Sequence, residues 1–253
     1  MFIQPNFTFN GIYSRDIGVS IATFDSGIFN VIGVEYSTDV SIEHNLVDYN
    51  PYYTESFTET SEIELNLLVY NPVTMKAIDV SNTNLEELYD WLITDNFVSF
   101  VSDDDVDLTY YFKVVKIQKV LSFNREGYLR VTFKPFSKYA YRKRVYKTSV
   151  NGEKEIDIFN LSRQLYCPMV EITNKGNNST VNIINGMKII DINKNETIVI
   201  DNLTRLIQTK DGINKFSHCQ DRKWLELKPR QNNKILLKGN MEIEIICEFP
   251  ISL

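Results

Sequence analysis

Short alternations of apolar and polar residues run through most of the chain, and they predict a protein built mainly of β-strands. In residues 1–135, apolar positions repeat with a period of two, which is typical of strands that bury one face. The segments with this pattern are Phe7–Phe9, Ile17–Ile21, Ile63–Val69, Tyr111–Ile117 and Leu129–Phe133.

One segment departs from this period and predicts an α-helix. Its apolar residues recur at the spacing of a single helical face: Leu85, Leu88, Trp91 and Leu92. Asn84 followed by Glu87 resembles a capping box at the helix start. Trp91 is therefore expected in the core between helix and sheet, in preference to a ligand-stacking role.

Beyond residue 135 the strand pattern continues in shorter segments, separated by turn-forming residues such as Asn151–Gly152 and Lys238–Gly239–Asn240. The predicted strands are Glu155–Ile158, Met169–Thr173, Thr180–Ile184, Lys188–Ile192, Thr197–Ile200, Leu203–Gln208, Leu225–Leu227, Lys234–Lys238 and Glu242–Glu248. Because no helical spacing interrupts them, this part is predicted to be a β-sandwich or jelly roll.

Charge divides the chain into two parts of opposite sign. Residues 1–135 hold 20 acidic and 8 basic side chains, a formal −12, whereas residues 136–253 hold 13 acidic and 19 basic, a formal +6. This asymmetry predicts two domains, 1–135 and 136–253. The basic and aromatic segment Lys134–Arg144 lies at the join. A nucleic-acid patch is one hypothesis for it, but its aromatic residues continue a strand alternation and favour a domain connector.

Sequence signatures of catalysis and metal binding are missing. The chain has no glycine-rich phosphate loop and no GxSxG elbow. Its two histidines, His44 and His218, stand outside any zinc spacing. His218 beside Cys219 is interpreted as a loop histidine next to a buried cysteine. Cys167, Cys219 and Cys247 are expected to be reduced and mostly buried, and we expect no cofactor and no metal.

The acidic run Ser102–Asp107 admits three hypotheses. Asp103, Asp105 and Asp107 alternate as calcium ligands do, but the glycine and the glutamate of a calcium loop are absent. A solvated hairpin tip is the plainest interpretation. The third is a wall of negative charge that faces a passing polyanion.

Bulk properties narrow the function further. The net charge of −6 argues against a sequence-reading nucleic-acid binder. The N-terminus lacks the features of a secretory signal, and no apolar run approaches the ~20 residues of a membrane span. We therefore expect a soluble protein made in a cytosol, with no membrane insertion.

Several motifs resemble those of siphophage distal tail proteins. Residues Phe7–Val19 follow the pattern F-x-F-N-G-x-x-S-x-D-x-G-hydrophobic that opens this family. The Trp91–Leu92 helix and Gly127–Phe133 continue its N-terminal domain, and Trp224–Gly239 is similar to a W-x-x-L-x-P-G-x-N-x-I segment of its C-terminal domain. Arg230 stands where the family often has glycine, so the turn is expected to differ there. The resemblance covers essentially the whole chain.

The resemblance implies an N-terminal, tail-tube-like β-sandwich with one helix and a hairpin, followed by a galectin-like C-terminal β-sandwich. It implies a non-enzymatic virion protein, assembled in the bacterial host cytoplasm as a homo-hexameric ring. Its partners would be the tail tube, the end of the tape measure, and tail-associated and upper baseplate proteins. Phage DNA would pass the channel without specific binding. Candidate channel-lining residues are Asp103, Asp104, Asp105 and Asp107.

Two other classes remain as alternatives. A carbohydrate-binding, lectin-like β-sandwich could stack a sugar on an exposed aromatic residue, with Trp224 as the first candidate. A glycosidase would need a pair of carboxylates, and no local signature indicates one. A mass of about six protomers in solution would support the ring, and a monomer would support the alternatives.

Overall fold

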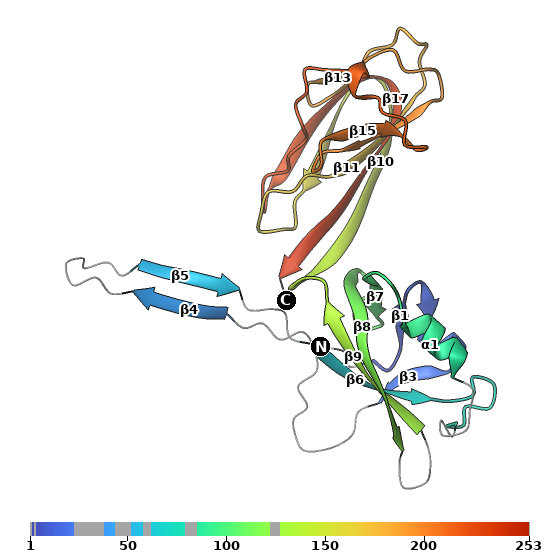
Figure 1. The fold of residues 1–253 in the computed structure, drawn as a ribbon. Helices are drawn as coiled ribbons and strands as arrows, with labels where there is room; N and C mark the ends of the chain where they lie inside the picture. Colours follow the sequence, from blue (N-terminus) through green and yellow to red (C-terminus); the bar gives the residue numbers. More distant parts are fainter. Residues whose placement is uncertain are drawn as a thin grey trace. The chain divides into compact units, whose positions relative to one another are not determined.

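The computed structural model describes residues 2, 4–22, 38–43, 52–57, 62–78, 85–121 and 127–252. The chain divides into two compact units, which are Met1–Ala140 together with Ser252–Leu253, and Tyr141–Ile251 (Figure 1). The predicted mainly-β fold is confirmed, and in these described ranges α1 (Glu86–Leu92) is the one α-helix.

The first unit is built of antiparallel strands in two rows, and β8 belongs to both rows. The strands are β1 (Phe7–Phe9), β2 (Ile12–Tyr13), β3 (Val19–Ala22), β6 (Ile63–Val69), β7 (Val98–Ser102), β8 (Leu108–Leu121) and β9 (Gly127–Pro135). One row runs β3-β6-β9-β8 and the other β2-β1-β7-β8. The 3-10 helix η1 (Ser14–Ile17) joins β2 to β3. A separate antiparallel pair is formed by β4 (Thr38–Glu43) and β5 (Tyr52–Phe57).

Helix α1 closes the aromatic core of this unit, as the sequence predicted. Trp91 is 5% exposed, and its indole nitrogen donates to the carbonyl of Phe9 at 2.9 Å. Its ring stacks on Phe7 at 5.8 Å and meets Phe9 edge-on at 5.7 Å. The helix starts after Leu85, which caps it without a side-chain hydrogen bond, and the predicted cap Asn84 lies outside the described residues.

The second unit consists of strands and one short 3-10 helix, η2 (Phe216–His218). The strands are β10 (Tyr139–Phe159), β11 (Met169–Asn174), β12 (Asn182–Ile184), β13 (Met187–Ile189), β14 (Thr197–Asp201), β15 (Leu206–Thr209), β16 (Cys219–Gln220) and β17 (Asn232–Ser252). One sheet runs β15-β14-β11-β17-β10, and the other runs β16-β13-β12-β17. Side chains from both sheets form one aliphatic core, which includes Ile172, Ile189, Ile198, Leu237 and Ile245.

Two of the predicted turns are wrong, because the two longest strands run through them. β10 continues through Asn151–Gly152, and β17 continues through Lys238–Gly239–Asn240, so they lie side by side as uninterrupted strands (Figure 1). Gly239 has φ +128°, and a Cβ there would stand 2.2 Å from the Asn182 side chain. This glycine therefore permits close approach of β12 and does not reverse the chain.

Other predicted elements differ in extent. Leu225–Leu227 forms no strand and contributes only the isolated bridge Tyr166↔Leu227. Ile17 ends η1 and is not a strand residue. Of the strand predicted over Lys188–Ile192, only the part to Ile189 is strand, although Ile192 is buried as an apolar alternation requires.

Buried asparagines hold the turns of the second unit. The side-chain nitrogen of Asn174 donates to the carbonyl of Ile192 at 2.7 Å, and its oxygen accepts from the Asn182 amide at 3.1 Å. Asn202 donates to Pro168 O at 2.7 Å and accepts from Leu225 N at 2.8 Å. Each of these side chains satisfies backbone groups that a turn leaves without a strand partner.

Candidate functional site

The acidic run forms the turn of an antiparallel hairpin, as its plainest interpretation predicted. β7 pairs with β8 through Phe100↔Tyr110, and the residues between Ser102 and Leu108 form the turn. Asp103, Asp104 and Asp107 are exposed, and Asp105 is half-buried. The hairpin therefore gathers the four predicted carboxylates at one tip.

The carboxylates of this tip are not simply solvated. Asp103 accepts a hydrogen bond from the Tyr13 hydroxyl at 2.8 Å. Asp104 accepts from the backbone of Gln4 at 3.0 Å and from the Ser102 hydroxyl at 2.7 Å. Two of the four acids thus attach the N-terminal segment to the hairpin. The hydrogen bond to Asp103 is also the main reason that the pKa of Tyr13 is raised.

Asp105 serves the turn itself. Its carboxylate accepts the backbone N–H of Asp107 at 3.0 Å, and its carbonyl accepts from Leu108 at 3.1 Å. No three His, Cys, Asp or Glu side chains in the described ranges are grouped so that they could hold a metal ion. No helix in the described part of the chain is long and apolar enough to cross a membrane.

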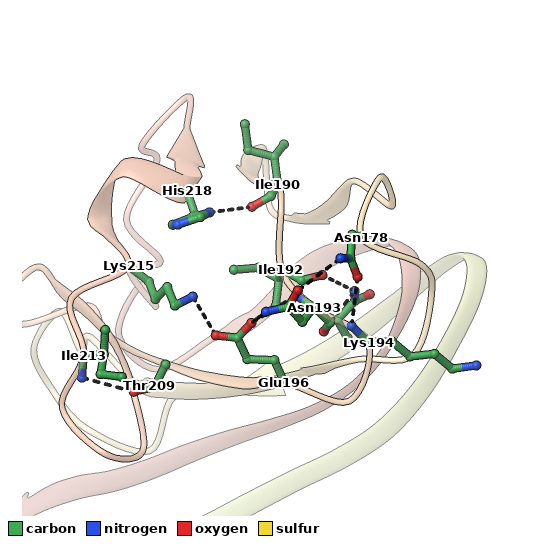
Figure 2. Close-up of polar contacts among 11 residues, drawn as sticks. Asn178, Ile190, Ile192, Asn193, Lys194, Glu196, Thr209, Ile213, Lys215 and His218 are labelled. Carbon is green, nitrogen blue, oxygen red and sulfur yellow. Dashed lines mark hydrogen bonds and ion pairs between the residues drawn. The ribbon is translucent and has the colours of Figure 1, made fainter.

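His218 and Cys219 have the structural roles expected of them. His218 ends η2, and its Nδ1 lies 3.3 Å from the carbonyl of Ile190 (Figure 2). Cys219 is buried, and burial raises the pKa of its thiol to about 11. A thiol in this state is a poor nucleophile at neutral pH. His44 lies outside the described residues.

Trp224, the candidate for sugar stacking, is partly buried in the second unit. It packs against the core of the second unit and stacks on Phe216 with ring centroids 6.5 Å apart. The guanidinium of Arg222 lies 4.0 Å from the centre of the Phe216 ring. Phe216 is thus the aromatic neighbour of Trp224, and Arg222 covers part of the Phe216 ring.

An open depression of about 580 Å³ lies on one sheet of the second unit, away from Trp224. We call it the charged groove, and six of its lining residues define it: Lys147, Ser149, Glu171, Lys210, Glu242 and Glu244. Glu171 on β11 and Glu244 on β17 are directly opposite in register. Their like charges are offset by Lys210, 2.7 Å from Glu171, and by Lys147, 2.7 Å from Glu244.

Sequence reasoning missed this groove. Its residues come from β10, β11, β17 and the position after β15, and no local motif joins them. The available signal was the polar face of each strand, for example Glu171 and Thr173 alternating with buried Val170 and Ile172. That alternation predicts which side chains of a strand face outward, but it does not predict which strands lie beside it.

The sequence matches known families along nearly its whole length. Residues 2–137 match a phage tail protein N-terminal domain, and residues 139–247 match a phage tail C-terminal domain. The chain belongs to this phage tail protein family. A search of curated proteins finds no significant match to this phage tail protein.

Solved structures share the fold of this phage tail protein. The crystal structure of SPP1 Dit, described as a paradigm of the hub adsorption apparatus of phages that infect Gram-positive bacteria, matches with a TM-score of 0.61 and 15% identity. That match covers 97% of this chain and 98% of SPP1 Dit. Two structures of the activated phage p2 baseplate, with Ca and with Sr, contain chains that match with TM-scores of 0.54 and 0.53.

The p2 matches have 10% and 11% identity and cover 97% and 96% of this chain and 98% and 97% of those chains. The family models thereby confirm a phage tail protein, and the likeness to SPP1 Dit confirms the fold that the resemblance to siphophage distal tail proteins implies.

Proposed function

We propose that this phage tail protein is a non-enzymatic hub at the distal end of the tail, where it joins the tail tube to the baseplate. The observation that carries the proposal is the match of both units, in one chain, to SPP1 Dit over 97% of this chain and 98% of that chain. A match of both units in the same order is more informative than a shared sandwich, because single β-sandwiches host many functions. In this role the protein acts in the virion.

The hub would be a closed ring of six copies. Within the described residues, β3 and β2 end the two rows of the sheet. The outer side of β3 is partly occupied, because the N–H of Ile21 donates to the Pro5 carbonyl at 2.7 Å, whereas β2 pairs only with β1 and offers the open edge. Open edges favour pairing with another chain, and a closed ring removes them. We propose that first units pair edge to edge around the ring.

Mass in solution tests the ring. Light scattering of the purified full chain at micromolar concentration should give about 177 kDa, six times the 29.5 kDa of one chain. Negative-stain images should then show rings with six-fold symmetry. A particle of 29.5 kDa at every concentration would contradict the proposal.

The ring would surround a channel for DNA, and we propose that Asp103, Asp104, Asp105 and Asp107 contribute to its wall. Six copies of a −12 domain would make a strongly negative annulus. Because duplex DNA carries about one charge per 1.7 Å of axis, such a wall would repel it from every side. DNA could then move without being bound.

A structure of the ring tests the channel. The proposal expects hairpin carboxylates on the inner wall and no tight DNA binding at physiological salt. The first unit also carries basic residues on one face of its sheet, namely Lys113 and Lys116 on β8 and Arg130 and Lys134 on β9. An inner wall dominated by these cations would discard the acidic-channel proposal while leaving the ring intact.

A further inference from the structure

We propose that the charged groove of the second unit binds a neutral, polyhydroxylated ligand, namely a short stretch of a saccharide chain. This binding activity would be additional to the hub role and does not depend on it. It rests on the arrangement of charges in the groove, on its size and on the position of its polar groups.

The groove presents hydrogen-bond acceptors and donors side by side. Glu171, Glu242 and Glu244 each contact a lysine through Oε2, at 2.7, 3.0 and 2.7 Å. In the described ranges no hydrogen bond or ion pair is found for the Oε1 atoms of these carboxylates, which leaves an acceptor on each. Each lysine ammonium carries three N–H donors and uses one of them in the ion pair with its carboxylate. A hydroxyl group of a ligand can donate to a carboxylate and accept from an ammonium group at the same time.

The balance of charge selects against ionic ligands. The three carboxylates in the groove are matched by Lys147 and Lys210 inside it and by Lys175 at 3.0 Å from Glu242. An anionic ligand would compete with the carboxylates for the ammonium groups, and a cationic ligand would compete with the lysines. A neutral ligand can bridge the pairs without breaking them, so it leaves no charge unpaired.

Size and spacing fit a saccharide chain. A volume of about 580 Å³ lies within the range of small-molecule sites. The polar residues stand on adjacent strands, β10, β17 and β11, about 4.8 Å apart. A pyranose ring has a similar length, so consecutive sugars would meet consecutive strands. Ser149 and Thr173 add hydroxyls at the groove.

Weak binding is expected. None of the lining side chains in the described structure is aromatic, so the stacking that strengthens many sugar sites is missing here. We expect a dissociation constant on the order of 1 mM, the affinity of a site that relies on hydrogen bonds alone.

Saturation-transfer NMR on the full chain tests the proposal with named probes. Maltotriose and N-acetylchitotriose are the neutral trisaccharides, deacetylated chitotriose is the cationic one, and a sulfated trisaccharide is the anionic one. We expect transfer to at least one neutral probe and at least tenfold less to both charged probes.

Variants locate the site. Ser149→Trp fills the groove from an exposed position and should abolish the transfer, and Lys210→Met should weaken it severalfold. Glu155→Gln is the matched control, because Glu155 forms a similar exposed pair with Lys234 at 2.8 Å outside the groove. It should bind as the parent does.

Three results would overturn the proposal. They are no transfer to either neutral probe, equal transfer to charged probes, and transfer that survives both groove variants. None of these measurements depends on the mass of the particle. Their failure would therefore not affect the hub proposal, which light scattering tests separately.

Discussion

At the residue scale, the opening motif of the chain has a physical explanation. Asn10 and Gly11 have φ of +51° and +76°, which reverses the chain between β1 and β2. Ser14 is fully buried, and its hydroxyl accepts the backbone N–H of Phe7 at 3.1 Å. Gly18 has φ +72° and ends η1. The pattern of small and polar residues in this motif therefore specifies one tight connection, which the buried residues Ser14 and Gly18 anchor.

Gly18 should tolerate no side chain. A Cβ at Gly18 would stand 1.9 Å from the carbonyl oxygen of Tyr70, whereas at Gly11 it would meet nothing within 4 Å. We expect Gly18→Ala to lower the free energy of unfolding by more than about 3 kcal/mol, because a backbone clash adds to the strain of a left-handed residue. Gly11→Ala should cost only about 1 kcal/mol. Urea unfolding of both variants checks this, and equal losses would contradict it.

Arg230 occupies a position that favours glycine. Its φ is +53°, and its backbone N–H donates to the carbonyl of Asn160 at 3.1 Å. We expect Arg230→Gly to stabilise the protein by about 0.5–1 kcal/mol, because relief of the left-handed conformation exceeds the added entropy of the unfolded chain. Thermal unfolding of the variant measures this. A lower melting temperature would show that the arginine side chain adds more stability than its left-handed backbone conformation removes.

Asn174 should be among the least replaceable polar residues of the second unit. Asn174→Ala would leave the Ile192 carbonyl and the Asn182 amide without their partner in a buried site. We expect a loss of about 2–4 kcal/mol, since each buried group left unsatisfied costs about 1–3 kcal/mol. Asn178→Ala, which removes exposed hydrogen bonds to Asn193 and Lys194, is the control and should cost under about 1 kcal/mol.

At the element scale, helix α1 depends on Trp91. Trp91→Ala should lower the free energy of unfolding of the first unit by about 3–5 kcal/mol, as for large aromatic truncations in cores. Trp91→Phe should lose less, because a smaller aromatic ring remains beside Phe7 and Phe9, although the hydrogen bond to Phe9 O and part of the buried indole volume are removed. A variant that melts like the parent would contradict this packing.

A salt bridge joins two loops of the second unit. Glu196 lies 2.6 Å from Lys215, and both side chains are mostly buried, while the Asn193 amide also donates to the carboxylate at 2.9 Å (Figure 2). The hydrogen bond from Lys215 is the main cause that lowers the pKa of Glu196. Because the folded pKa lies below the unfolded value of about 4.3, this stabilisation is full above pH 4.3 and is lost as pH falls through the folded pKa.

Glu196→Gln should therefore cost about 1.5–3 kcal/mol at pH 7 and less at pH 3. Chemical unfolding at both pH values measures the difference. The control is Glu153→Gln, which removes the exposed pair with Lys238 and should cost under about 1 kcal/mol. An equal effect of Glu196→Gln at both pH values would contradict the role of the ion pair.

Most strands could be predicted from the sequence, because alternation such as Ile63–Val69 reports directly which residues face the core. The long strands β10 and β17 were split wrongly, because glycine after asparagine or lysine is also the signal of a turn. Only the residue that packs against the glycine distinguishes a continuous strand from a turn, as Asn182 does at Gly239.

At the scale of the whole molecule, the acidic hairpin could be predicted because its residues are consecutive. The contacts of Asp103 with Tyr13 and of Asp104 with Gln4 could not, since they join residues about 90 to 100 positions apart. The charged groove is the stronger case. Lys147, Glu171 and Glu244 become neighbours only through strand pairing, which a single sequence does not report.

The division of the chain carries one more consequence. The first unit includes residues at both ends, Met1–Ala140 and Ser252–Leu253, so the second unit is an insertion between them. A gene segment that encodes Tyr141–Ile251 could be exchanged for another as a cassette, provided that its ends match the strands β10 and β17. Recombination between phages could in this way replace one half of the protein and preserve the other.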